Sequence, residues 1–261
     1  MLLAFDTSSA AVTVALATPT GEIVASSTTV DALRHGELLA PAIAAALESA
    51  GVTPRDLTRI AVGVGPGPFT GLRVGLVTAR TMGEVLGIEV AGVCSLDILA
   101  RQSTLTLPVA VATDARRKEI YWALYDGPAA DGSRRRLEGP AVDKPAEVAH
   151  VLSGLPVIGR GAVLYADILT TVPPPTSTTG TSATSATGTS ASATSAAGAA
   201  SSTSHTAGVA GAGGVAAVVE YPSAEVLAAG VATRTLEVVA PEPMYLRRPD
   251  VTMSSGPKSV L

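Results

Sequence analysis

The chain has 261 residues, of which 47% are hydrophobic and only 3% aromatic, and its formal net charge is −4. This length suits one large domain or two small ones, whose core must be built from Ala, Val and Leu. The acidic balance gives no net attraction to nucleic acid, and the single cysteine, Cys94, excludes an internal disulfide and a thiolate metal site.

The N-terminus lacks the features of a secretory leader. It has no basic segment, and Asp6 interrupts the first apolar run, so we expect no signal peptide. No apolar run approaches the ~20 residues that a membrane span needs. We therefore expect a soluble, cytoplasmic protein without a membrane partner.

The N-terminal part of the chain alternates between short apolar runs and helix patterns. The run at 2–5 predicts a buried strand that ends in the polar turn Asp6-Thr7-Ser8-Ser9. Further strands are expected at 12–16, 23–29, 60–64 and 88–93, and helices at 37–50, 70–86 and 95–102. Three strands followed by α/β crossovers predict a mixed sheet covered by helices.

A second, weaker α/β pattern follows. Strands are expected at 109–112, 119–125 and 157–158, and helices at 146–152, 161–169 and 223–233. We assign 1–104 to an N-terminal lobe, and 105–172 with 215–250 to a smaller second lobe.

The stretch 173–214 consists almost entirely of Ser, Thr, Ala and Gly. It cannot bury enough apolar area to offset its ordering entropy. We predict a disordered low-complexity insert there and a flexible tail at 251–261.

Few side chains form a catalytic or metal-binding pattern. No two of the three histidines have the i, i+4 spacing of a helical metal site, and no Gly-x-Ser-x-Gly elbow is present, so we predict neither a metal site nor a catalytic residue. We expect a capping or surface role for His35 and a buried structural role for Cys94. The run Arg134-Arg135-Arg136 is expected in a solvated turn.

Two features are candidates for phosphate binding. Asp6-Thr7-Ser8 follows a strand, as the Mg²⁺ and phosphate residues of actin-like ATPases do, but spacing alone favours an Asx or Ser/Thr turn. The loop 65–71 opens a helix whose N–H groups could bind an anion. Pro66 and Pro68 remove two of those donors, and no Walker lysine follows.

Small residues recur at every fourth position of the helix expected at 70–86: Gly71, Gly75, Ala79 and Gly83. Each interior glycine costs roughly 1 kcal/mol relative to Ala, so the column needs a packing or functional reason. From spacing alone, packing inside the lobe and contact with a partner helix are both open.

Several strings along the chain together resemble the TsaB family. They are Asp6-Thr7-Ser8, Arg34-His35-Gly36-Glu37-Leu38-Leu39, Gly65-Pro66-Gly67-Pro68-Phe69-Thr70-Gly71-Leu72-Arg73, Gly159-Arg160-Gly161-Ala162 with Tyr165, and Met244-Tyr245-Leu246-Arg247. The family usually has Ser in place of Gly36. The resemblance covers nearly all of the chain except the insert, and the string at 65–73 is its most specific part.

This resemblance implies a two-lobed actin-like, ribonuclease-H-like α/β fold with mixed sheets flanked by helices. It also implies a non-catalytic subunit that dimerises with the transferase TsaD. TsaD installs the N6-threonylcarbamoyl group on the adenosine after the anticodon of tRNA. The His-x-x-x-His metal motif of TsaD is missing here, since Cys94-Ser95-Leu96-Asp97-Ile98 contains no histidine.

The resemblance also implies partners and ligands. TsaE-like subunits would join the pair, a homodimer is an alternative, and tRNA would be contacted only through the complex. The chain alone would bind no cofactor, and ATP or ADP could lie at the partner interface. A vestigial nucleotide site would consist of Asp6, Thr7 and Ser8.

The resemblance implies that the helices expected at 37–50 and 70–86 form the dimer face, and the column of small residues lies on the second of these helices. This agreement favours partner contact over internal packing. The predicted interface consists of Glu37, Leu39, Ile43, Thr70, Gly71, Arg73, Gly75, Ala79 and Gly83.

The alternative function is a stand-alone actin-like ATP-dependent transferase or a glycoprotease-like enzyme. The ATPase version needs a second, glycine-rich phosphate loop, and Thr113-Asp114-Ala115-Arg116 lacks the glycines.

Overall fold

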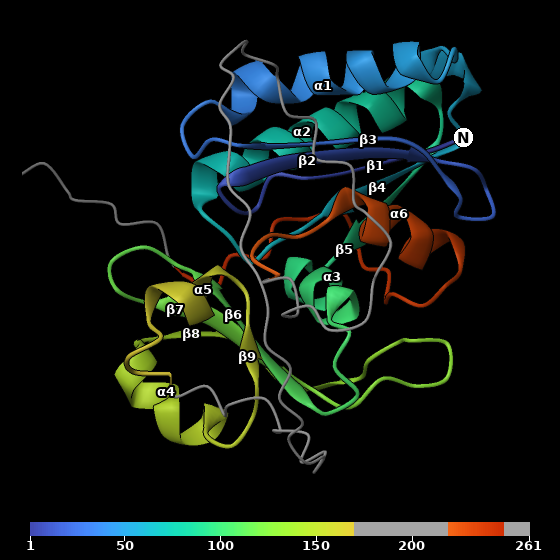
Figure 1. The fold of residues 1–261 in the computed structure, drawn as a ribbon. Coiled ribbons are helices and arrows are strands. Elements are labelled where there is room, and N and C mark those ends of the chain that lie inside the picture. Colours follow the sequence, from blue (N-terminus) through green and yellow to red (C-terminus); the bar gives the residue numbers. More distant parts are fainter. Residues whose placement is uncertain (170–218, 248–261) are drawn as a thin grey trace, which may run out of the picture. The chain divides into compact units, whose positions relative to one another are not determined.

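The computed structural model of the chain describes residues 1–169 and 219–247, which contact one another as one unit. The predicted insert at 173–214 and the predicted tail at 251–261 lie outside the described residues. In the described part, two mixed sheets each carry their own helices (Figure 1).

The first sheet has the strand order β3-β2-β1-β4-β5. Its members are β1 (Leu2–Asp6), β2 (Ala11–Ala17), β3 (Ile23–Val30), β4 (Arg59–Gly63) and β5 (Glu89–Val93). β1 pairs antiparallel with β2 and parallel with β4. Every residue of β1 and β2 is buried, as expected for apolar strands covered on both faces.

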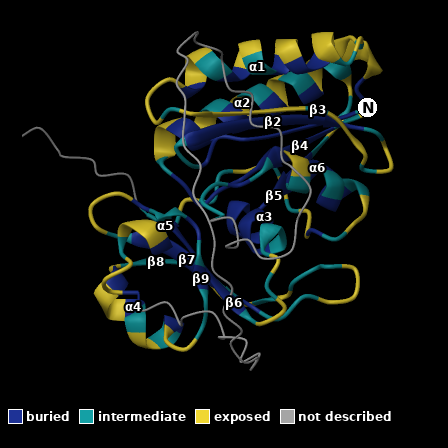
Figure 2. Cartoon of the chain, in the orientation of Figure 1, coloured by how far each residue is buried: buried dark blue, intermediate teal, exposed yellow. Residues whose placement is uncertain are grey.

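Helices cover both faces of this sheet. Leu3 and Phe5 of β1 pack against α1 (His35–Ser49) and α2 (Phe69–Leu86), whereas Leu2 and Ala4 face α6 (Ala224–Ala232). The outer side of α1 is exposed, β1 and β2 beneath it are buried, and the edge strand β3 is exposed (Figure 2). A short 3₁₀ helix, η1 (Pro54–Asp56), precedes β4, and α3 (Ser95–Gln102) follows β5.

The position of α6 differs from the prediction, which grouped 215–250 with the second lobe. The helix packs on the first sheet, where Ala4, Ala15 and Ala61 leave room for Leu227 and Val231. Small side chains on this face of the sheet therefore bring the chain back to the first lobe after the insert.

The second sheet has the order β8-β7-β6-β9, with β6 (Val109–Asp114), β7 (Ile120–Tyr125), β8 (Arg136–Asp143) and β9 (Val157–Ile158). α4 (Pro145–Leu152) and α5 (Arg160–Leu164) belong to this lobe. The sequence did not predict β8, because Gly139-Pro140 interrupts it and half of its residues carry no apolar pattern. The edge position and register shifts of β8 accommodate that interruption.

The predicted order β-β-β-α-β-α-β-α of the first lobe is confirmed, with helix bounds within two residues of those observed. α5 is shorter than predicted and ends at Leu164. Within residues 1–169 and 219–247, no helix has the length and hydropathy needed to cross a bilayer.

Candidate functional site

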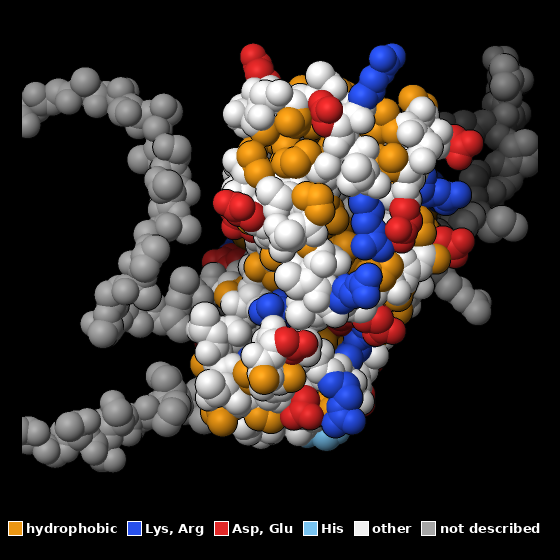
Figure 3. Space-filling view, turned by 90° about the vertical axis from the view of Figure 1, so that its right-hand side faces the viewer, with side chains coloured by type: hydrophobic (Ala, Val, Ile, Leu, Met, Phe, Trp, Pro, Cys, Tyr) orange, Lys and Arg blue, Asp and Glu red, His pale blue; other side chains and the backbone are white. Residues whose placement is uncertain are grey.

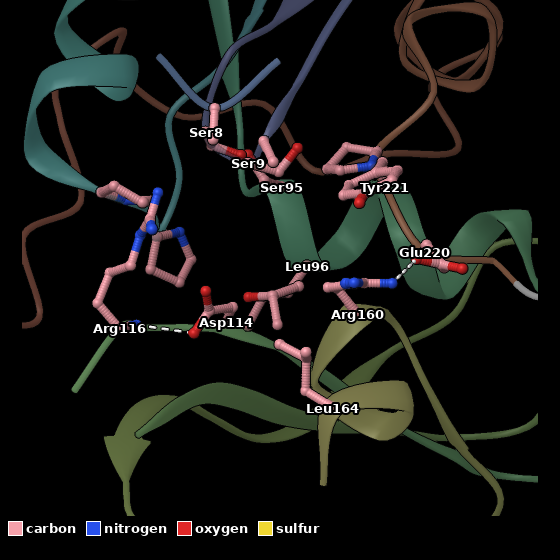
Figure 4. A pocket seen from close by; sticks show the side chains of 16 residues that line it. Ser8, Ser9, Ser95, Leu96, Asp114, Arg116, Arg160, Leu164, Glu220 and Tyr221 are labelled. Carbon is pink, nitrogen blue, oxygen red and sulfur yellow. Dashed lines mark hydrogen bonds and ion pairs between the residues drawn. The ribbon is translucent and has the colours of Figure 1, made fainter. Parts of the chain in front are cut away.

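A pocket of about 220 Å³ lies between the turns that end β1 and β6. Ser8 and Ser9 come from the β1–β2 turn, Ser95 and Leu96 from the start of α3, and Asp114 and Arg116 from the β6–β7 turn (Figure 4). Arg160 and Glu220 close another side, where Arg160 Nη1 lies 2.6 Å from Glu220 Oε2. The pocket thus presents hydroxyls and charges of both signs.

The carboxylate of Asp6 is fully engaged by the chain itself. Its Oδ1 accepts hydrogen bonds of 2.7 Å from both the backbone N–H and the hydroxyl of Ser8, and its Oδ2 accepts one of 2.6 Å from Ser95. Asp6 is 1% exposed, and burial raises its pKa although the hydrogen bonds from Ser95 and Ser8 oppose this. The acidic side chain therefore organises the turn and does not line the pocket.

Thr7 is engaged in the same way, by α2. Its Oγ1 donates to the carbonyl of Gly71 at 2.8 Å and accepts from the N–H of Gly75 at 3.0 Å. Of the predicted nucleotide-binding residues Asp6, Thr7 and Ser8, which the structure does bring together on one turn, only Ser8 lines the pocket.

The small residues of α2 pack inside the first lobe. A Cβ on Gly71 would lie 2.7 Å from the carbonyl oxygen of Thr7, and one on Gly75 would lie 2.5 Å from Thr7 Oγ1. Ala79 is fully buried, and a Cβ on Gly83 would collide with Val90. Their predicted role as a face open to a partner helix is wrong, because the β1–β2 turn and β5 already occupy that side of α2.

The other predicted interface residues fall into two groups. Leu39 and Ile43 belong to the core between α1 and the first sheet and are 1% and 5% exposed, so their predicted partner contact is also wrong. Glu37, Thr70 and Arg73 are exposed, and their contact with a partner stays a prediction.

Two further expectations about single residues are corrected. The side chain of His35 is buried and its Nε2 lies 2.7 Å from the carbonyl oxygen of Ser9, so His35 joins α1 to the β1–β2 turn. Arg136 begins β8 and binds Asp97 of α3, while Arg134 donates to the carbonyls of Leu107 and Asp126, so the basic run is not a solvated turn. The buried, structural role predicted for Cys94 agrees with its 1% exposure.

Sequence reasoning missed several residues that line the pocket. Arg116, Arg160 and Glu220 come from separate segments, and Glu220 lies just beyond the insert, where no sequence pattern pairs it with Arg160. The pocket also contains Thr113, whose buried Oγ1 has no hydrogen-bond partner. Among the described residues, no group of three His, Cys, Asp or Glu side chains is placed to hold a metal ion.

Comparison with known proteins identifies the family. The model of the family described as TsaD, tRNA N6-adenosine threonylcarbamoyltransferase, matches residues 22–254. The chain belongs to this family. Among its named relatives is the TsaB protein of Bacillus subtilis, a tRNA threonylcarbamoyladenosine biosynthesis protein, which is 34% identical over 128 residues, or 48% of this chain and 54% of that protein.

Two further comparisons add an uncharacterized relative and a solved structure. An uncharacterized protein of Mycobacterium leprae, ML0378, is 46% identical over 151 residues, which cover 57% of this chain and 40% of the relative. The aligned part of the chain thus covers about half of the Bacillus subtilis protein and less than half of ML0378. A Pseudomonas aeruginosa crystal structure described as similar to peptidase YEAZ aligns with a TM-score of 0.66 and 27% identity, covering 94% of this chain and 99% of that one. Together these matches support a TsaB-like protein of the actin-like superfamily.

Proposed function

We propose that this chain is a non-catalytic subunit that pairs with a TsaD-type transferase in the threonylcarbamoylation of tRNA. The names of its TsaB relatives and its family model support a role in this modification and do not favour the stand-alone enzyme. TsaE-type subunits and a homodimer remain further candidate partners, and any ATP or ADP is expected at the interface with the transferase. We expect the protein to act in the cytoplasm, since its lone buried Cys94 suits a reducing compartment.

The observation that carries the non-catalytic assignment is that the polar side chains of Asp6 and Thr7 in the β1–β2 turn are already hydrogen-bonded within the chain. In an actin-like ATPase, this turn would offer its carboxylate and hydroxyl groups to metal and phosphate. Here Asp6 is bonded to Ser8 and Ser95, and Thr7 is bonded to Gly71 and Gly75. Releasing them to a ligand would leave buried groups without partners, which is costly.

The exposed sides of α1 and α2 support contact with a partner. The two helices pack side by side on the same face of the first sheet (Figure 1). α2 exposes Val77 by 61% and Val85 by 77%, and α1 exposes Ala40, Ala44 and Ala45. Apolar side chains of this size on the outside of two adjacent helices favour a protein interface, so we assign the partner face to these side chains in place of the buried column.

The experiment is co-purification of the full chain with a TsaD-type transferase. Val77→Glu places a charge on the proposed interface, and we expect it to abolish or strongly reduce recovery of the transferase. Leu137→Glu is the matched control, because Leu137 is 52% exposed on β8 of the second sheet. Equal recovery with both variants, at unchanged melting temperature, would contradict the proposed interface.

A further inference from the structure

Three segments that are distant in the sequence meet around a second hollow of about 400 Å³. They are the start of α2, the β6–β7 turn and the C-terminal stretch at 245–247. We call their basic and aromatic members the arginine–aromatic cluster. Its members are Phe69, Arg73, Arg116, Arg117, Tyr245 and Arg247.

The aromatic half of this cluster is a preformed stack that remains open. The rings of Phe69 and Tyr245 lie 5.0 Å apart between centroids and are inclined by 26°. Arg73 Cζ sits 3.8 Å from the centroid of Phe69, and Arg73 Nε donates to the hydroxyl of Tyr245 at 2.9 Å. Even so, Phe69 is 40% exposed and Tyr245 38% exposed, so a flat ligand can reach them.

The cationic half comes from an unusual turn. Arg116, Arg117 and Lys118 have φ values of 62°, 53° and 62°, a region that non-glycine residues rarely adopt. All three side chains are exposed. Such backbone outliers cluster at binding sites, where the surrounding structure holds them. This turn follows Thr113-Asp114-Ala115, and the segment lacks the glycines of a phosphate-binding loop.

Hydrogen bonds and an ion pair hold this turn beside the stack. Ala115 N–H donates to the carbonyl of Glu119 and Glu119 N–H donates to that of Arg116, both at 3.0 Å. The carboxylate of Glu119 forms an ion pair with Arg247, whose Nη1 also donates to the carbonyl of Ala115 at 3.3 Å. Arg247 thus engages Glu119, and the second carboxylate of the turn, Asp114, accepts the N–H of Arg116 at 2.9 Å. The basic side chains of the turn, Arg116, Arg117 and Lys118, outnumber these two carboxylates.

We propose that the arginine–aromatic cluster binds single-stranded RNA, with a base on the Phe69–Tyr245 stack and phosphates beside the β6–β7 turn. Base stacking on aromatic rings combined with nearby arginines is how proteins recognise unpaired nucleotides. The cluster is distinctive because the whole chain is acidic. On the face drawn in Figure 3, by contrast, basic and acidic side chains are interleaved. This inference rests on the proposed role in tRNA modification and adds direct contact with an unpaired part of the RNA.

The test is fluorescence anisotropy of the full chain with a labelled single-stranded RNA of about ten nucleotides. We expect Arg116→Glu and Tyr245→Ala each to weaken binding by about tenfold or more, the effect of losing one stacked base or a phosphate contact. Tyr245→Phe should bind nearly as well as the wild type, since it keeps the ring. Arg80→Glu is the charge-matched control, because Arg80 is exposed on α2 but does not line the hollow.

Equal RNA binding by the wild type, Arg116→Glu and Tyr245→Ala, all with unchanged melting temperatures, would overturn the assignment. Competition by a poly-glutamate peptide but not by unlabelled RNA would likewise overturn it, because the ligand would then be an acidic protein segment. Either result would leave the transferase pairing standing, since Val77→Glu tests that pairing at different residues.

Discussion

Thr7 inserts its hydroxyl into the backbone hydrogen-bond ladder of α2. Gly71 and Gly75 are one helical turn apart, and Thr7 Oγ1 bridges the carbonyl of the first and the N–H of the second. A side chain on either glycine would lie within 2.7 Å of Thr7 atoms. The glycines are therefore explained by contact with the chain's own turn.

This explanation makes a direct prediction for Gly75→Ala. The new Cβ would lie 2.5 Å from Thr7 Oγ1, so we expect unfolding in urea to show a loss of about 1–3 kcal/mol, typical of overpacking. Gly36→Ala is the matched control in α1, where nothing lies within 4 Å of the new Cβ. It should be neutral or stabilise the protein by up to about 1 kcal/mol. Equal stability of the two variants would refute the contact.

Cys94 provides a prediction about pH. Burial, followed by the nearby charge of Asp97, raises its pKa from 9.0 to about 12. The thiol form is thus favoured in the folded state, and its contribution to stability is complete below pH 9 and is lost as pH rises towards 12. Between pH 8 and pH 10 the wild type should lose roughly 1 kcal/mol more than Cys94→Ala. Parallel stability curves for the two proteins would contradict this.

At the scale of elements, a buried ion pair joins α3 to β8. Arg136 donates to both carboxylate oxygens of Asp97, at 3.0 and 2.7 Å, and Tyr125 of β7 donates to Asp97 Oδ1 at 2.6 Å. The side chains of Asp97 and Arg136 are 10% and 21% exposed. Three elements are therefore held by one carboxylate.

Removing the charge of Asp97 should be strongly destabilising. Asp97→Asn removes the closer counter-charge of Arg136 and leaves only the exposed Glu237 carboxylate at 3.8 Å, and breaking a buried pair costs about 3–5 kcal/mol. We expect the lower end of that range because Arg136 retains some solvent contact. Asp126→Asn is the control, since the Asp126–Arg135 pair is exposed and its loss should change the urea midpoint little. Similar midpoints for both variants would show that the Asp97 pair is dispensable.

The sequence predicted elements better than it predicted their contacts. Apolar periodicity identified the strands and α-helices of the first lobe, because it directly reflects which faces are buried, but it did not predict η1. It missed β8, where Gly139-Pro140 breaks the pattern. It also assigned α6 to the second lobe, because nothing within 224–232 specifies the sheet on which the helix packs.

In the candidate site, too, the sequence predicted which residues are neighbours along the chain but not which residues they contact. Sequence alone grouped Asp6, Thr7 and Ser8, because they are consecutive after a strand. It could not show that Asp6 bonds to α3 and Thr7 to α2, nor that Arg160 meets Glu220 from beyond the insert. The small residues of α2 were ambiguous because internal packing and partner contact require the same spacing.

At the scale of the whole molecule, the C-terminal stretch connects both lobes with the candidate sites. Met244 N–H donates to the carbonyl of Val64 at 2.9 Å, and Arg247 reaches the β6–β7 turn. Tyr245 lies between these anchors and stacks on Phe69. The start of α2 supplies Phe69 and Arg73 to the arginine–aromatic cluster, and the same helix exposes Val77 and Val85, which is consistent with one subunit that contacts both a transferase and RNA.

The most direct test of the central proposal is reconstitution of tRNA threonylcarbamoylation from purified TsaD-type and TsaE-type subunits, with and without this chain. Our account predicts that modified adenosine forms efficiently only when the chain is added, and that Val77→Glu fails to replace the wild type whereas Leu137→Glu succeeds. Equal modification in the absence of the chain would contradict the account.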